Sequence, residues 1–265
     1  MNNSRSKYLS SSAPVLVFLV VATIWHFAVI AFKIPPIILP GPIAVANALW
    51  QEQLVLMNAS WVTLQAAAVG LLCSAIFGSL IAVVFSQSSL LRIALYPYVI
   101  FLQTVPIVAI APLLIIWSGN NFRTIVLVAT IISIFPVIAN VTSGLLSINE
   151  NLRELFRMQS ATRWQTLTKL RIPAAIPQLV LGLRVSSGLS VIGAIVAEFF
   201  VGNSGEYDGL GTIMTSRQAN LKTAELIAAL MACTCLGIIL FGLVNLLSAT
   251  VLRRWTRNSG FESDK

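Results

Sequence analysis

ENLRELFRMQSATRWQTLTKLRIPAAIP, residues 150–177, is the only long polar interval between strongly apolar stretches of this chain. Its five cations are Arg153, Arg157, Arg163, Lys169 and Arg171. A basic segment of this kind between two apolar spans lies outside the bilayer. It forms either a docking surface for another protein or a solvated loop that binds nothing, and its spacing alone leaves both open.

Two capping patterns predict two short helices in this segment. Asn151 is followed three residues later by Glu154, and Thr162 is followed by Gln165. In each pair the first side chain can accept from an orphan backbone N–H while the second reaches back to the cap. The helices expected are 152–159 and 163–171.

The two helices are expected to meet at Ser160-Ala161. Pro173 cannot supply a helical N–H, and Pro177 begins the next apolar span. The second helix is therefore predicted to end near Arg171.

The composition is that of an integral membrane protein. Of 265 residues, 57% are hydrophobic and 10% are charged, whereas soluble domains carry about 25% charged residues. We interpret the net charge of +8 as the result of cations that orient the chain in the membrane, and not as a sign of nucleic-acid binding. Three cysteines within apolar spans (Cys73, Cys233 and Cys235) predict neither a disulfide framework nor a metal site.

Six apolar segments are long enough to cross about 30 Å of hydrocarbon as helices. They lie at 13–32, 60–85, 95–118, 124–147, 177–200 and 224–251. The first follows two cations but has no small-residue cleavage site after it, so it is interpreted as a retained span. The fold class predicted is therefore an all-α polytopic membrane protein with six transmembrane helices.

Cation placement predicts the orientation. With the N-terminus inside, twelve of the 17 Lys and Arg residues lie in inner segments, four lie in outer segments, and Arg184 lies within a span. Cytoplasmic loops carry the excess of such residues. Both termini and the 150–177 segment are therefore predicted to be cytoplasmic.

The second span carries Gly70, Ser74 and Gly78 at four-residue spacing. Small residues so spaced let two helices approach closely. They predict a packing seam within or between subunits, with ordinary scatter of small residues as the alternative.

Prolines kink the third and fourth spans and free backbone carbonyls there. They are Pro106, Pro112 and Pro136. Gln103, Thr104, Ser133 and Asn140 lie near these kinks and are candidates for a polar translocation path. The alternative is hydrogen bonding between helices.

Glu198 lies near the outer end of the fifth span, about 21 Å along the helix from Arg184, so the two cannot pair. Glu198 is expected either to line an outer gate or to reach the outer interface. The glycine-rich segment 201–223 that follows carries no phosphate-binding motif, and none occurs elsewhere in the chain.

The 150–177 segment resembles the coupling-loop signature of ABC importer permeases, which is Glu-Ala-Ala, three residues, Gly, then a hydrophobic residue before Pro. The matching positions are Glu154-Leu155-Phe156, Ser160 and Ile172-Pro173, so both alanines and the glycine are replaced. Further motifs resemble the nitrate/sulfonate/taurine branch of that family. They are Thr104-Val105-Pro106, Ala111-Pro112-Leu113, Gly182-Leu183-Arg184 and Gly209-Leu210-Gly211.

The resemblance implies an ABC type I importer permease in a prokaryotic inner membrane. Its implied partners are a second copy of this chain, two ATPase subunits that use ATP and Mg, and an extracytoplasmic binding protein. The chain itself is then no enzyme and binds no cofactor. Its parts would be 1–59 (tail, first span and outer loop), 60–252 (permease core with coupling helices at about 150–172) and 253–265 (tail).

The resemblance also assigns coupling residues. They are Glu154, Leu155, Phe156, Ser160, Ala161, Arg163 and Pro173. Phe156 would be the apolar knob in an ATPase groove, Glu154 an orienting cap or ion-pair partner, and Ser160 the turn.

The alternative function is an ATP-independent secondary transporter or channel. It would need paired ionisable residues near the bilayer midplane, and His26 and Arg184 show no evident partner in the sequence. The substrate implied by the resemblance is a small anion, such as nitrate, bicarbonate or a sulfonate, or a pyrimidine-type vitamin precursor. Its specificity is expected to reside in the binding protein.

Overall fold

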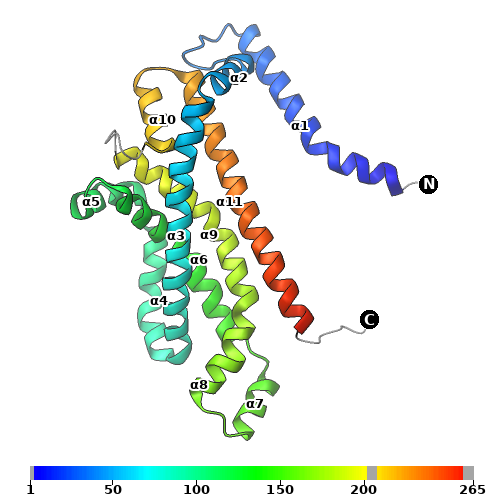
Figure 1. The fold of residues 1–265 in the computed structure, drawn as a ribbon, viewed down its shortest axis with the longest axis vertical. Helices are drawn as coiled ribbons and strands as arrows, with labels where there is room; N and C mark the ends of the chain where they lie inside the picture. Colours follow the sequence, from blue (N-terminus) through cyan, green and yellow to red (C-terminus); the bar gives the residue numbers. More distant parts are fainter. Residues whose placement is uncertain (1–2, 202–207, 259–265) are drawn as a thin grey trace.

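The computed structural model describes residues 3–201 and 208–258, and over these residues the chain is entirely helical (Figure 1). The elements are α1 (Asn3–Ala31), α2 (Pro42–Gln51), α3 (Gln53–Gln87), α4 (Ser89–Thr104), α5 (Ile107–Ser118), α6 (Phe122–Leu146), α7 (Glu150–Met158), α8 (Arg163–Thr166), the π-helical segment η1 (Leu167–Arg171), α9 (Ile172–Val201), α10 (Leu210–Ala219) and α11 (Thr223–Asn258). The all-α prediction is confirmed over the part described.

The six predicted spans are only partly matched. Within the described residues, four helices are long and apolar enough to cross a membrane: Gln53–Gln87, Phe122–Leu146, Arg163–Val201 and Thr223–Thr250. The bent pair α4 and α5 makes a fifth if it is counted as one span. The apolar part of α1, Leu16–Ala31, is shorter than these.

The third span is not the single kinked helix that the sequence suggested. Its two halves, α4 and α5, meet at an angle of 99°. Val105 is extended, with φ −70° and ψ 127°, and Pro106 caps the next helix. A residue before proline avoids the helical region, and proline offers no N–H to the preceding turn, so the chain breaks here instead of bending gently.

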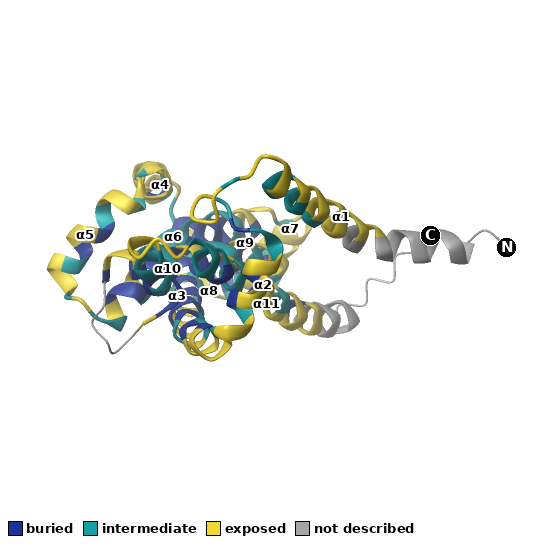
Figure 2. Cartoon of the chain, turned by 90° about the horizontal axis from the view of Figure 1, so that it is seen from above, coloured by how far each residue is buried: buried dark blue, intermediate teal, exposed yellow. Residues whose placement is uncertain are grey.

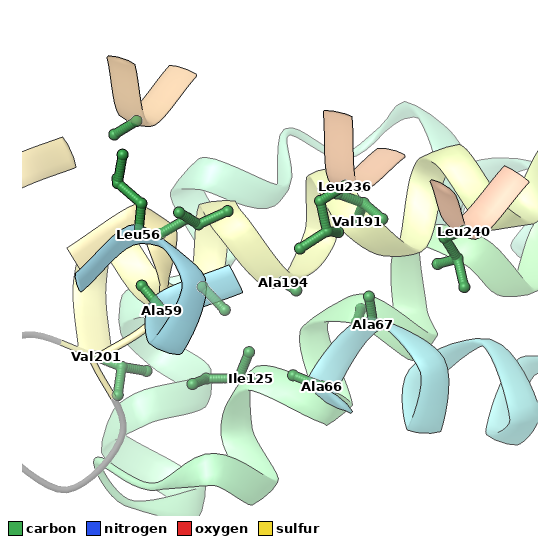
Figure 3. Close-up of a cluster of buried hydrophobic side chains, with 14 of the residues drawn as sticks. Leu56, Ala59, Ala66, Ala67, Ile125, Val191, Ala194, Val201, Leu236 and Leu240 are labelled. Carbon is green, nitrogen blue, oxygen red and sulfur yellow. The ribbon is translucent and has the colours of Figure 1, made fainter. Parts of the chain in front are cut away.

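The centre of the molecule consists of α3, α6 and α9, with α11 alongside (Figures 1 and 2). Alanines and branched aliphatic side chains, most of them from these four helices, fill the largest buried cluster, part of which Figure 3 shows. By contrast, the Leu16–Ala31 part of α1 and much of α4 and α5 carry mostly exposed side chains (Figure 2).

Small residues bring α3, α6 and α9 into close contact. An ideal Cβ on Gly70 of α3 would lie 2.6 Å from the Cβ of Ala129 on α6, and one on Gly78 would lie 2.9 Å from Val137 Cγ1. Ser74, between them, is also fully buried. From the other side, a Cβ on Gly193 of α9 would lie 2.7 Å from the Cα of Ala129. The Gly70–Ser74–Gly78 row therefore faces α6 of the same chain.

Two glycines of α9 provide a matched test of this packing. Gly193→Ala is expected to lower the free energy of unfolding by about 2 kcal/mol, because the new methyl group overlaps backbone atoms of α6. Gly188→Ala is expected to leave stability unchanged or raise it by up to about 1 kcal/mol, since a Cβ there meets no atom within 4 Å. Thermal unfolding of the full chain in detergent measures both. Equal effects of the two changes would contradict close packing at Ala129.

The end of the bundle with α2 and α10 is fastened by ion pairs that the sequence did not reveal. Arg217 of α10 contacts Glu52, between α2 and α3, at 2.7 Å and Glu225 of α11 at 3.0 Å. Their side chains are only 16–23% exposed. These residues lie far apart in the sequence, so no local pattern could have paired them. They hold four helices together at this end.

Candidate functional site

The segment predicted to dock a partner forms the end of the molecule opposite α2 and α10 (Figure 1). None of the residues of α7 or α8 is buried. Residues of an exposed helix that are not needed for packing are free to serve a partner.

The start of α7 differs from the prediction. Asn149, not Asn151, is the N-cap, and its side-chain oxygen accepts from the N–H of Asn151 at 3.0 Å. The helix therefore begins two residues earlier than expected. Glu154 does not serve as a cap, and its side chain makes no hydrogen bond or ion pair among the described residues. Both Asn149 and Asn151 suit a cap, and the sequence alone could not choose between them.

The two faces of α7 differ in chemistry. Leu152 and Leu155 are 44% and 48% exposed, and Met158 is 84% exposed. The opposite face carries Arg153 and Arg157, four residues apart. Phe156 lies on the apolar side but is half-buried, so Leu152 and Leu155 are more accessible than the predicted knob. An amphipathic helix with an uncovered apolar face suits insertion into a groove of a partner.

Ser160 occupies the position where the family signature has glycine. Its φ of +53° is in the left-handed region. Its N–H donates to the Arg157 carbonyl at 3.0 Å, and the Ala161 N–H donates to the Phe156 carbonyl at 3.0 Å. These two bonds form a Schellman motif, which ends α7 sharply. The turn is thus made with serine, at the cost of a conformation that glycine adopts more easily.

The second capping pattern is confirmed. Thr162 Oγ1 accepts from the Gln165 N–H at 3.2 Å, and Gln165 Oε1 accepts from the Thr162 N–H at 2.8 Å. This box begins α8 at Arg163, whose side chain is exposed. The direction of the chain after the turn is therefore fixed locally.

The prediction that this helix ends near Arg171 is wrong. The helix continues through η1 into α9, so that Arg163–Val201 is one helix of 39 residues. The Ile172 N–H donates to the Leu167 carbonyl, five residues back. Pro173 and Pro177 then lie inside α9. Proline stops helices that have only their own hydrogen bonds, whereas α9 is held by its packing against α6. The segment that contains α8 is consequently continuous with a span.

Glu198 is fully buried, so it does not reach the outer interface. Its Oε2 accepts from the Gly211 N–H at 2.8 Å and from Thr63 Oγ1 at 3.0 Å. Thr63 Oγ1 in turn accepts from the Leu210 N–H at 2.9 Å. Glu198 and Thr63 therefore satisfy two of the orphan donors at the N-terminus of α10.

Two glycines make room for this carboxyl group. A Cβ on Gly209 would lie within 2.1 Å of Glu198 Oε1, and one on Gly211 within 2.5 Å of the Ile195 carbonyl. The two glycines of the Gly209-Leu210-Gly211 motif are thus required because α9 approaches the start of α10 too closely for a Cβ. The other glycines of this segment, Gly202 and Gly205, lie outside the described residues. The motif was visible in the sequence, but its partner Thr63 was not.

The candidates for the translocation path do not come together. Gln103 and Thr104 are exposed at the end of α4. Ser133 is buried between helices, and its carbonyl accepts from Ser186 Oγ at 2.6 Å. Asn140 Nδ2 donates to the Pro136 carbonyl at 2.8 Å, within α6. Ser133 therefore fits a contact between α6 and α9, and membership of all five residues, Glu198 included, in a path stays a prediction.

Arg184 lies within α9 with its Nε buried and without a hydrogen-bond partner among the described residues. No carboxylate within the described part of the chain pairs with it. The paired ionisable groups that a self-sufficient secondary transporter needs are therefore not found within the described spans.

Comparison with known proteins places these features in context. The family model described as binding-protein-dependent transport system inner membrane component matches residues 74–258. A probable ABC transporter permease protein of Haemophilus influenzae is 31% identical over 228 residues, covering 86% of this chain and 91% of that protein. A formylaminopyrimidine transport permease protein of Halalkalibacterium halodurans is 28% identical and covers 92% of this chain and 96% of its own length.

A putative aliphatic sulfonates transport permease protein of Bacillus subtilis is 29% identical, covering 91% of this chain and 86% of that protein. Among solved structures, one of a methionine ABC transporter in an inward-facing conformation superposes with a TM-score of 0.62. It is 18% identical and covers 77% of this chain and 98% of its own. At that identity the likeness concerns the fold.

Proposed function

Because this chain belongs to the family of binding-protein-dependent transport system inner membrane components, we propose that α7 and α8 are the elements through which separate ATPase subunits drive it. The chain is a membrane-spanning permease subunit of an ABC importer for a small solute, in the nitrate/sulfonate/taurine branch. Such importers work with ATPase subunits and a substrate-binding protein.

The observation that carries the proposal is the uncovered apolar face of α7 at one end of the bundle. Leu152 and Leu155 lie on a short helix that is capped at both ends. The turn at Ser160 joins it to the 39-residue helix Arg163–Val201, which begins with α8. A displacement of α7 is therefore passed to α9, and from α9 to α6 and α3, against which it packs closely. A ligand at a distance can shift a two-state equilibrium in this way if its contacts differ between the states.

We place the α7–α8 end and both termini in the cytoplasm, where ATP is available. The distribution of Lys and Arg supports this orientation. In the assembly we propose, two copies of this chain form the permease, and each copy engages one ATPase subunit. ATP and Mg are used in the ATPase subunits, and this chain supplies neither a catalytic group nor a cofactor site.

For the substrate we propose a small solute of the kinds named for the relatives, namely a sulfonate-like anion or a pyrimidine-type precursor. Specificity is proposed to reside in the partner binding protein, because the described spans bring no cluster of polar candidates together. Thermal unfolding of that binding protein with a panel of both compound classes identifies the class.

Two engineered cysteines test the orientation. In a chain whose three native cysteines are replaced, Arg163→Cys is expected to react with a membrane-impermeant maleimide only after the cells are permeabilised. Lys222→Cys, at the opposite end and exposed, is expected to react in intact cells. Labelling of Arg163→Cys from outside would invert the topology and exclude cytoplasmic coupling through α7. Copurification of the tagged full chain with an ATPase subunit tests the partnership itself.

A further inference from the structure

A cavity of about 440 Å³ lies between α7, the start of α8 and the end of α3. Four arginines line it: Arg153 and Arg157 from α7, Arg163 from α8 and Arg171 from η1. The remaining polar lining consists of Ser86 and Gln87, in the last turn of α3, and Thr166 of α8. We call this cavity the arginine pocket. None of the described residues that line it is acidic.

The positive charges of the arginine pocket are poorly compensated. Arg153 lies 3.6 Å from Glu150, but both side chains are more than half exposed, so this ion pair is weak. Arg171 Nη1 donates to the Ser86 carbonyl at 2.6 Å, which satisfies one donor but brings no negative charge. Arg157 and Arg163 have no ion pair among the described residues. Four like charges around one cavity repel one another unless an anion lies between them.

The chemistry of the lining selects the kind of anion. Guanidinium groups present planar pairs of N–H donors that match the oxygens of phosphate, and several of them can share one phosphate group. The cavity lies at the last turn of α3, just before α4 begins at Ser89, where the chain leaves one apolar helix and enters the next. We expect the phospholipid headgroups of a bilayer at this depth, because the apolar part of α3 ends here.

We propose that the arginine pocket binds a phosphate group, carried either by an anionic phospholipid headgroup of the adjacent leaflet or by free inorganic phosphate. On α7 the pocket lies on the face opposite the proposed docking face, because Arg153 and Arg157 lie opposite Leu152 and Leu155. Ala161 and Arg163, which also line the pocket, are among the residues expected to couple to the ATPase subunits. The assignment of the pocket to the cytoplasmic leaflet rests on the proposed orientation, whereas the binding itself does not.

A bound phosphate would also have a mechanical effect. Arg153 and Arg157 belong to α7, whereas Ser86 and Gln87 belong to α3, and the described contacts between these two helices are otherwise few. An anion shared by the four arginines ties α7 to η1 and to the end of α3. The angle at which α7 meets its partner then depends on the occupancy of the pocket.

The test uses the purified full chain and two phosphate sources. Native mass spectrometry compares retention of phosphatidylglycerol with that of phosphatidylcholine. Thermal unfolding in phosphatidylcholine nanodiscs compares inorganic phosphate with chloride at equal ionic strength. Arg157→Gln combined with Arg163→Gln is expected to lower the affinity for the preferred phosphate source by about thirtyfold. Arg157→Lys keeps the charge but not the paired donors. Its affinity for phosphate should fall between those of the wild-type chain and the double variant.

The matched control removes two other positive charges near the same end of the molecule. Lys169→Gln with Arg92→Gln changes residues that do not line the arginine pocket, and it is expected to leave both measurements unchanged. If the chain prefers phosphatidylglycerol but is not stabilised by inorganic phosphate, the ligand of the pocket is a lipid headgroup. If only inorganic phosphate has an effect, the ligand is the free anion.

The proposal would be overturned if the wild-type chain neither retained phosphatidylglycerol preferentially nor was stabilised by inorganic phosphate. It would also be overturned if the arginine double variant and the control double variant lost the same amount of phosphate affinity. If the arginine variants instead lost only their ATPase subunits, the pocket would be a seat for acidic side chains and the phosphate proposal would fall. Cysteine labelling of the orientation is independent of these results, so failure here leaves the proposed function standing.

Discussion

Glu198→Ala is expected to lower the free energy of unfolding of this permease by about 3 kcal/mol. The change removes the acceptor of the Gly211 N–H and of the Thr63 hydroxyl in a site that no solvent reaches. A buried donor left without a partner loses its hydration and gains nothing in return. The start of α10 should then loosen, and with it the contacts of Arg217 to Glu52 and Glu225 at the same end.

Thermal unfolding of the detergent-solubilised chain measures this loss, and uptake per copy of the chain in the membrane shows its consequence. Glu198→Gln is the matched control, because its amide oxygen can still accept from Gly211 and its shape is nearly the same. We expect it to recover most of the stability. Wild-type stability in Glu198→Ala would show that the carboxyl group does not hold α10. Reduced uptake per copy at normal stability would instead favour a role of Glu198 in the translocation path.

Leu152→Asp combined with Leu155→Asp is expected to reduce substrate-stimulated ATP hydrolysis of the assembled importer by at least about tenfold. Each leucine that a groove buries contributes about 1.5–3 kcal/mol, and a carboxylate there must be desolvated without a partner. Both side chains are nearly half exposed in the chain, so the change should not affect its folding. Hydrolysis in proteoliposomes, with and without the loaded binding protein, measures the coupling.

The control for this experiment lies on the other face of the same helix. Glu150→Gln changes a side chain that is 66% exposed and points away from the leucines, and hydrolysis is expected to stay normal. Phe156→Asp gives a graded comparison, since Phe156 is half-buried and its loss also affects the chain itself. Full stimulation in the double leucine variant would exclude α7 as the docking element.

The candidate site shows how far local patterns extend. The capping box at Thr162 and Gln165 was found from the sequence because both partners lie within one turn of the chain. The start of α7 was placed at the wrong asparagine, because Asn149 and Asn151 are equally suitable caps and the choice depends on where the preceding span ends. The prolines after Arg171 predict the end of a helix, but packing against α6 continues the helix through them.

Glu198 shows that contacts between residues distant in the sequence cannot be predicted from local patterns. The sequence identified an acidic residue at the end of a span and a Gly-x-Gly motif after it, but it could not connect them. Thr63 lies 135 residues before Glu198, and only the approach of α3 to α9 brings it to the carboxyl group. The arginine pocket has the same origin, since its cations were recognised as a basic segment while the wall supplied by Ser86 and Gln87 was not.

The sequence alone predicts a helical membrane protein, a basic element that separates two of its spans, and the family signature that this element resembles. These properties follow from hydrophobicity, charge and short-range capping, which act between neighbours along the chain. Tertiary structure alone decided which face of α7 is open, which residues hold α10, and that four arginines surround one cavity. Those outcomes depend on how closely small residues let α3, α6 and α9 approach, and such contacts join residues that no local pattern relates.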